Sequence, residues 1–210
     1  MNFALSTCFL PRNANSCSRS ISIQSGLVEP DPHSDFHSSE TGAPFRDCIS
    51  CGLPFDHAPE TPYLVAKSYR RGECIFEYAI CEDCRTSMSR EFSRDSRQAL
   101  KLFFQERVNL SERSSLLSHQ YVPAPWIQKC AACEKPRHEA ESYSLGGILL
   151  GSDMIYDPYP LCLCGNCEEE IQSLLSPGTK GIWDEFVDTH FDGPPSNLKD
   201  LPVKGRPVLF

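Results

Sequence analysis

Eight of the twelve cysteines form four Cys-x-x-Cys pairs. Each such turn directs two thiolates at one centre, and two turns together supply the four sulfur ligands of a tetrahedral zinc site. A catalytic zinc requires an open coordination position. Four thiolate ligands leave none, so this spacing favours structural zinc. We therefore predict two structural Zn²⁺ ions, each held by four cysteines. The ligands are Cys48, Cys51, Cys81 and Cys84 for one ion, and Cys130, Cys133, Cys164 and Cys167 for the other.

Disulfides and thiol redox chemistry are the alternatives for these cysteines. A redox pair needs an exposed thiolate of low pKa, and no neighbouring residue singles one out. Residues 1–10 lack the basic and apolar regions of an export signal, so we expect a cytoplasmic protein in which thiols stay reduced. Cys162 lies two residues before Cys164 and is an alternative ligand, although we interpret it, like Cys74, as a buried strand residue.

The cysteine layout occurs twice in the chain. Cys48 and Cys51 precede Cys130 and Cys133 by 82 residues, and the second pairs are offset by 83. The offset of 83 then continues without a gap, and apolar residues match apolar ones while Ser93 matches Ser176. The sequence therefore predicts an internal duplication, with one architecture for both halves.

Each half contains the same predicted elements. In the first, residues 63–69 and 74–80 are rich in aromatic and β-branched residues and flank Arg71-Gly72, which indicates a hairpin. The second cysteine pair should begin a helix, and Ser93 or Ser96 should cap another that carries an apolar stripe at helical spacing. In the second half, the strands are expected at 143–150 and 154–163, and Pro177 in the first turn of the last helix.

These elements define the expected domain organisation. We predict a disordered leader at 1–44, a first four-cysteine zinc module at 45–122, a Pro-rich linker at 123–125, a second module at 126–193 and an extended tail at 194–210. Each module is so small that its core alone gives marginal stability, which a metal would raise.

A zinc knuckle, a hairpin and a helix that begins at the second cysteine pair together resemble the treble-clef group of zinc fingers. The resemblance covers residues 45–108 and 126–192 and implies small α+β zinc-stapled modules in tandem, each a knuckle, a β-hairpin and two helices. The zinc ribbon is the near alternative, but there the second pair lies on a hairpin. Treble clefs occur in adaptors, nucleic-acid binders and nucleases, so the fold group alone chooses no function.

Two further signals bear on function. Asp56-His57 resembles the Asp-His pair of HNH-type nucleases, yet Arg85 and Thr86 stand where those enzymes place an Asn or His on the following helix. A basic strip interleaved with Glu91 and Asp95 is typical of a solvated helix face with local ion pairs, although it could contact nucleic-acid phosphates. The strip consists of Arg85, Arg90, Arg94, Arg97 and Lys101.

Charge argues against a general polyanion binder. The net charge is −8, and residues 126–193 hold 4 Lys/Arg against 12 Asp/Glu, whereas residues 45–122 hold 11 of each. We therefore expect a non-enzymatic adaptor or regulator with a protein partner and no membrane association. Nucleic-acid binding through the basic helix of the first module is the alternative, and an HNH-type nuclease is the remote one.

Overall fold

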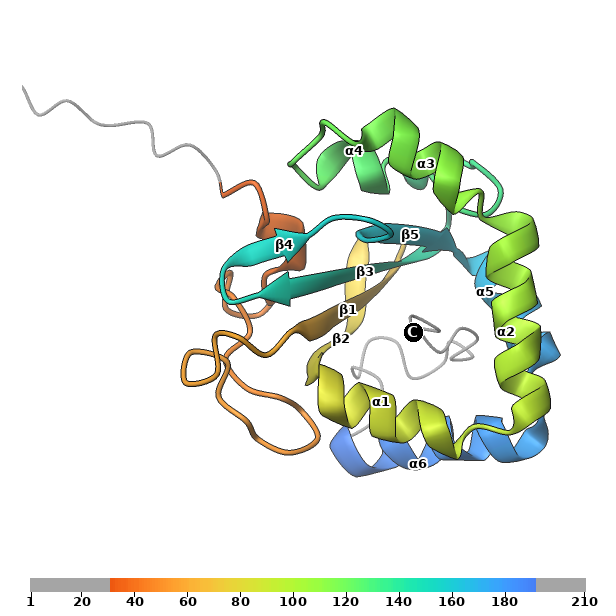
Figure 1. The fold of residues 1–210 in the computed structure, drawn as a ribbon, viewed down its shortest axis with the longest axis horizontal. Coiled ribbons are helices and arrows are strands. Elements are labelled where there is room, and N and C mark those ends of the chain that lie inside the picture. The colour runs from red at the N-terminus through yellow and green to blue at the C-terminus, as the bar shows by residue number, and fades with distance from the viewer. Residues whose placement is uncertain (1–30, 192–210) are drawn as a thin grey trace, which may run out of the picture. The chain divides into compact units, whose positions relative to one another are not determined.

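One antiparallel sheet joins the two cysteine-containing halves of the chain in a computed structural model, which describes residues 31–191 (Figure 1). The strand order is β2-β1-β3-β4, and β5 also pairs with β3. The strands are β1 Tyr63–Arg70, β2 Glu73–Cys81, β3 Ser142–Leu150, β4 Asp153–Ile155 and β5 Leu161–Cys164. The helices are α1 Glu82–Glu91, α2 Arg94–Arg107, α3 Leu110–Leu117, α4 Ala124–Ile127, α5 Gly165–Leu174 and α6 Pro177–His190, with short 3-10 turns η1 Ser34–Phe36 and η2 Arg137–Glu139.

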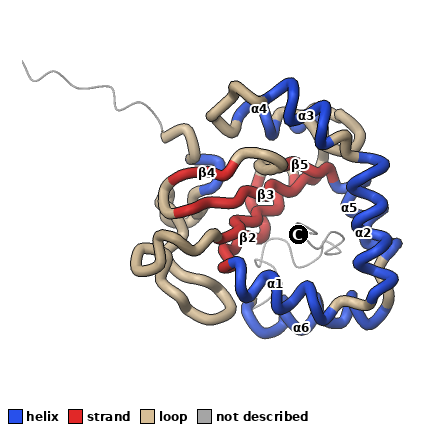
Figure 2. Tube along the Cα trace, in the orientation of Figure 1, coloured by secondary structure: helices blue, strands red, loops and turns tan. Residues whose placement is uncertain are grey.

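The central seam of the sheet pairs β1 of the first half with β3 of the second. The pairing is continuous from Tyr63 opposite Leu149 to Arg70 opposite Ser142. Both inner strands are flanked on each side and are largely buried, and Figure 2 shows the strands gathered together among the helices. The two halves therefore share one sheet, although the sequence predicted a separate hairpin in each.

The register assigns side chains to the two faces of the sheet, because directly opposed residues in antiparallel strands lie on the same face. Cys81 is paired with Tyr63 and Cys164 with Tyr143, so both cysteine clusters lie on one face, which we call the knuckle face. The opposite face is covered by helices: the ring of Tyr78 contacts that of Phe186 in α6, with centroids 5.4 Å apart.

Helices of each half pack against helices of the other half. Helix α2 packs against α5, and α6 packs against α1, so each half contributes a helix to the other (Figure 1). The apolar stripes expected on α2 and α6 form much of the core, which includes Leu100, Phe103, Trp183 and Phe186. Ser93 caps α2 by accepting a hydrogen bond from the Ser96 N–H, as predicted.

The N-cap residues of α2 and α6 are half-buried and lie next to one another. Ser176 caps α6 as Ser93 caps α2, and Pro177 follows in the first turn as predicted. The Ser93 N–H donates to Thr179 Oγ1 at 3.1 Å, and the Ser176 N–H donates to Ser96 Oγ at 2.9 Å. These four residues, which we call the hydroxyl cluster, satisfy helix N-termini from both halves.

Three expectations about the chain between and within the modules need correction. Helix α3 occupies residues 110–117, for which the sequence predicted no helix or strand, and α4 occupies 124–127 across the predicted linker at 123–125. The strand expected at 154–163 is divided into β4 and β5. Residues 156–160 break it because Pro158 and Pro160 lack the N–H groups that a ladder requires.

The segment before the first knuckle is also more ordered than its composition suggests. Residues 34–36 form η1, and Phe36 is only 1% exposed, so the expected disorder of residues 1–44 does not hold there. The polar composition of residues 1–44 gave no indication that Phe36 is buried. Residues 1–30 of the predicted leader, and the predicted tail at 194–210, lie outside the described residues. None of the helices within residues 31–191 has the length and apolar character needed to span a membrane.

Candidate metal centres

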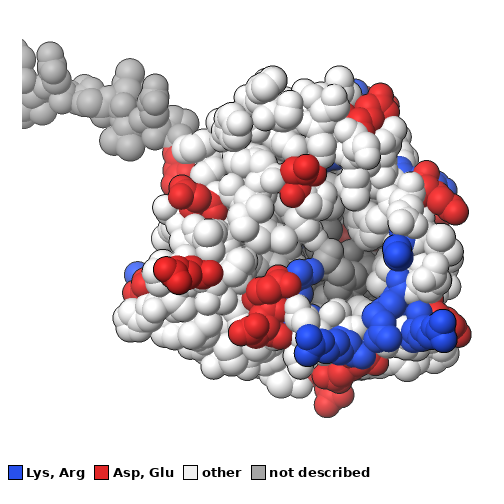
Figure 3. Space-filling model, viewed as in Figure 1, with Lys and Arg blue, Asp and Glu red and all other residues white. Residues whose placement is uncertain are grey.

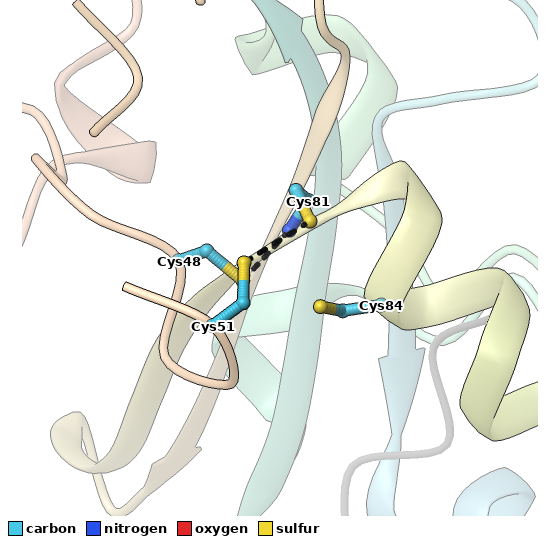
Figure 4. A group of neighbouring side chains, drawn as sticks. All are labelled: Cys48, Cys51, Cys81 and Cys84. Atoms are coloured by element: carbon cyan, nitrogen blue, oxygen red, sulfur yellow. Dashed lines mark hydrogen bonds between the residues drawn. The ribbon is translucent and has the colours of Figure 1, made fainter. Parts of the chain in front are cut away.

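The first cluster brings together all four cysteines predicted for it. Cys48 and Cys51 lie on a loop, Cys81 ends β2 and Cys84 lies in the first turn of α1 (Figure 4). Their sulfur atoms all lie within 4.8 Å of one another. The Cys51 and Cys81 sulfurs are 3.9 Å apart.

The second cluster has the same construction. Cys130 and Cys133 lie on a loop, Cys164 ends β5 and Cys167 is in the first turn of α5, with the four sulfurs again within 4.8 Å. The Cys133 and Cys164 sulfurs are 3.5 Å apart. Both predicted ligand sets are therefore assembled, and these two groups are the only ones of their kind found among residues 31–191.

The sulfur spacing suits a tetrahedral ion. Four sulfurs at a Zn–S distance of about 2.3 Å stand about 3.8 Å from one another when the angles are tetrahedral. The observed separations of 3.9 and 3.5 Å bracket that value, whereas a disulfide would bring two sulfurs to about 2.05 Å. The donor set thus fits zinc, with no protein ligand missing.

Backbone geometry holds the loop cysteines in place. In the first loop the Cys48 N–H donates to the carbonyl of Leu53, and the Gly52 N–H donates back to that of Cys48. In the second loop the same two bonds join Cys130 with Lys135 and Glu134. Gly52 has a φ of +68°, a left-handed conformation that glycine adopts without strain.

The second loop uses a residue with a side chain at the equivalent turn. Glu134 has a φ of +59° and takes the place that Gly52 has in the first loop. A non-glycine residue in this region costs of order 1 kcal/mol or more. The second knuckle is therefore held by its surroundings in a conformation that its own sequence does not favour.

Each loop is also fixed to the end of a strand. The backbone N–H of Cys81 donates to the Cys48 sulfur, and that of Cys164 donates to the Cys130 sulfur, both at 3.3 Å. Burial acts to raise the pKa of Cys48, but N–H groups led by that of Cys81 outweigh it and lower the pKa overall. Hydrogen bonds to the charged form favour thiolate, which is the ligand form of cysteine.

Several of the other cluster thiols resist ionisation without a cation. Burial raises the pKa of Cys84, and the neighbouring thiols Cys81, Cys51 and Cys48 add to the effect. Burial likewise raises the pKa of Cys130 to about 11 and raises that of Cys167. Several thiolates this close repel one another, so the fully ionised clusters require a bound cation.

Arg113 is a residue near the second cluster that sequence reasoning missed. Burial is the main cause that lowers its pKa, and the charge of Cys130 acts in the opposite direction. Its guanidinium donates to the carbonyls of Trp126 and Pro160 and lies 5.2 Å from the centroid of the Trp126 ring. A tetrathiolate zinc site carries a net negative charge, which this cation would partly offset. The sequence could have indicated the position of Arg113 near the second cluster only through a predicted helix corresponding to α3.

The two further cysteines within residues 31–191 lie outside the clusters. Cys162 is 1% exposed within β5, and its carbonyl accepts a hydrogen bond from the Ala131 N–H, so it is the buried strand residue that we expected. Cys74 lies in β2 but is only half-buried, and its sulfur is 3.6 Å from Glu77 Oε2. Neither belongs to a four-cysteine group.

Asp56 and His57 are both exposed, with side-chain exposures of 80% and 77%. The His57 Nε2 atom is 3.8 Å from Asp56 Oδ1, and neither residue belongs to a potential metal-binding group in the part of the chain that the structure describes.

The basic strip is only partly paired. Arg85 is held by Glu82 at 2.7 Å, and Arg97 donates to the carbonyls of Arg90 and Phe92, where it closes the end of α1. The predicted ion pairs with Glu91 and Asp95 are not formed among residues 31–191. Three exposed cations of the strip therefore have no carboxylate partner in this range, and Figure 3 shows Lys and Arg side chains gathered over α1 and α2. They are Arg90, Arg94 and Lys101.

No protein-family model, curated protein or solved structure matches this chain.

Proposed function

We propose that this protein binds two structural zinc ions in tandem treble-clef-like modules and acts as a protein–protein adaptor or regulator. The observation that carries the proposal is the spacing of the four sulfurs in each cluster, which suits a tetrahedral ion and leaves no coordination position for a substrate. The equivalent placing of the ligands, on a knuckle, a strand end and a helix start, supports an origin by internal duplication.

The zinc proposal is tested by replacing zinc with Co²⁺. We expect two metal ions per chain and the visible absorption of tetrahedral cobalt–thiolate sites. That spectrum should stay unchanged on addition of azide, because four protein ligands close each site. A spectral shift with azide, or a single ion per freshly reduced chain, would contradict two closed sites.

The adaptor role is supported by the charge of the second half and by the closed sites, since neither suits catalysis or broad polyanion binding. It predicts that the zinc-loaded protein forms a complex with a protein partner that survives nuclease treatment. Reconstitution of that complex from two purified proteins, and its loss on zinc removal, would test the role directly.

Nucleic-acid binding through α2 is the second candidate. Arg90 at the end of α1 and Arg94 and Lys101 in α2 favour it, because these exposed cations have no carboxylate partner within residues 31–191 and are available to phosphates. Binding of this kind would be weak and strongly dependent on salt.

A further inference from the structure

The knuckle face of the sheet is covered near its centre by residues 31–43, which we call the strap. The strap contributes η1 but no strand, so it is attached by side chains and by a few backbone contacts. In Figure 1 it is the red and orange segment beside β4. Its outward residues Ser34, Glu40 and Thr41 are exposed. The strap therefore lies on a surface that the strands build without it.

An aromatic anchor fixes the strap to β3. Phe36 is 1% exposed and lies against Gly147, where an added Cβ atom would come within 2.7 Å of the Phe36 ring. The absence of a side chain at Gly147 therefore makes the recess that the ring fills. On either side, Asp35 pairs with Arg137 at 3.3 Å, and His33 lies 3.3 Å from the Tyr156 hydroxyl.

A buried ion pair in the sheet forms hydrogen bonds with the next part of the strap. Lys67 Nζ is 3.3 Å from Glu77 Oε2, with side-chain exposures of 3% and 18%, and it also donates to the His37 carbonyl. Glu77 accepts hydrogen bonds from the Ser38 hydroxyl at 2.9 Å and from the Ser39 N–H at 2.8 and 2.9 Å. Polar groups of the strap thus form hydrogen bonds with both charged side chains of this ion pair.

We propose that this surface is a peptide-docking site that the strap occupies in cis, and that a partner segment of the same chemistry competes for it. The surface consists of the Gly147 recess, the Lys67–Glu77 pair and Arg137. The ligand it fits is a short segment with an acidic residue, then an aromatic one, then a hydroxyl residue two positions after the aromatic one and a free backbone N–H at the next position. The inference rests on the proposed adaptor function and names the surface through which it would act.

Covalent attachment explains why the strap would occupy the site by default. A tethered segment acts at a high effective concentration, so a free peptide competes poorly until the strap is released. A change of side chain within the strap can cause this release. A carboxylate in place of the Ser38 hydroxyl would face the Glu77 carboxylate, leaving one cation, Lys67, for two anions.

The experiment uses a fluorescent peptide of residues 31–43 and full-length zinc-loaded variants, with binding followed by anisotropy. We expect Ser38→Glu to bind the peptide at least about tenfold more tightly than the wild type, because its own strap is released. Ser34→Glu is the matched control, since it adds the same charge at an exposed strap position. Gly147→Ala should release the strap but fail to bind the peptide, because it fills the recess. A Phe36→Ala peptide should bind at least about tenfold more weakly to the Ser38→Glu protein.

The proposal would be overturned if the Ser38→Glu protein bound the peptide no more tightly than the Ser34→Glu protein. It would also be overturned if the Ser38→Glu protein bound no more tightly than the Gly147→Ala protein or than the wild type. Zinc content is measured on every sample. Two ions per chain without peptide binding would reject the docking site alone, whereas fewer ions would count against the proposed zinc function.

Discussion

The Ser176 hydroxyl donates a hydrogen bond to the Ser93 hydroxyl at 3.1 Å, although 83 residues separate them. Each serine is the N-cap of a helix, and each comes from a different cysteine-containing half. The two helix starts therefore satisfy their polar groups through one another, beside the buried Ser96 and Thr179, where unsatisfied groups would be costly.

The hydroxyl cluster should couple the stabilities of the two halves. Ser96 is 1% exposed and accepts from the Ser176 N–H at 2.9 Å, so Ser96→Ala should lower the free energy of unfolding by about 1–3 kcal/mol. Exposed Ser87→Ala is the control and should change it by less than about 0.5 kcal/mol. Urea unfolding of Ser96→Ala, Thr179→Val and the double variant should give a coupling energy above about 0.5 kcal/mol, and strict additivity would contradict a shared network.

Loss of one zinc site should unfold both halves. Cys167→Ser removes a ligand of the second cluster, but β1 of the first half is paired with β3 of the second and α2 is packed on α5. Without β3, β1 loses one of its two neighbouring strands, and the shared core loses its helices. Proton–nitrogen NMR of Cys167→Ser should therefore show collapsed dispersion for residues 45–108 as well.

Cys74→Ser is the matched control, because Cys74 lies outside both clusters, and its spectrum should resemble that of the wild type. A native-like spectrum for residues 45–108 in Cys167→Ser would show that the first half folds on its own.

Glu168 should make stability fall as pH rises. It is 3% exposed, and burial raises its pKa to about 7, although a hydrogen bond from Ser144 acts to lower it. Because the folded pKa lies above the unfolded value, the folded state holds its proton over a pH range in which the unfolded state loses it. Relative to Glu168→Gln, the wild type should lose up to about 1.4 kcal/mol per pH unit between about pH 5 and 7.

The measurement is urea unfolding of both proteins across this range, with exposed Glu169→Gln as the control for the charge change alone. Because zinc affinity also varies with pH, the comparison is made between variants at each pH. Parallel curves for the wild type and Glu168→Gln would contradict the assigned shift.

Nucleic-acid binding, if it occurs, should depend on the exposed cations of α2. Arg94→Glu should weaken binding of a mixed-sequence duplex at low salt and reduce the slope of log K against log salt by about 1, because one phosphate contact is lost. Lys129→Glu makes the same charge change in the second half and should have a smaller effect. Titrations by anisotropy at several salt concentrations test this, and equal effects of the two variants would reject α2 as the binding element.

The local features of this fold were predictable from sequence. The aromatic and β-branched residues on either side of the turn at Arg71 placed the first hairpin within about one residue of β1 and β2, and the cysteine spacing predicted both groups of four cysteines that could hold a metal ion. Ser93 and Pro177 marked helix starts because capping depends on neighbouring residues alone.

The features that were missed depend on contacts between distant residues. Nothing near Phe36 indicates that Gly147 leaves space for its ring, and nothing near Tyr63 indicates that Leu149 lies opposite it. The polar helix α3 has a weak apolar pattern and is fixed by contacts such as those of Arg113 with the Trp126 and Pro160 carbonyls. Pairing between the halves could not be inferred, because each half read alone suggested a complete hairpin of its own.

The seam between β1 and β3 also sets an order of events during synthesis. The ribosome completes β2 at Cys81 but must add 150 − 81 = 69 further residues before the end of β3 is made. At a translation rate of about 5–20 residues per second, this takes roughly 3–14 s. During that interval β1 presents an unpaired edge rich in apolar residues, the kind of edge that pairs with other chains. The first half cannot complete its core before β3 is made, so the nascent chain is open to misassembly throughout this interval.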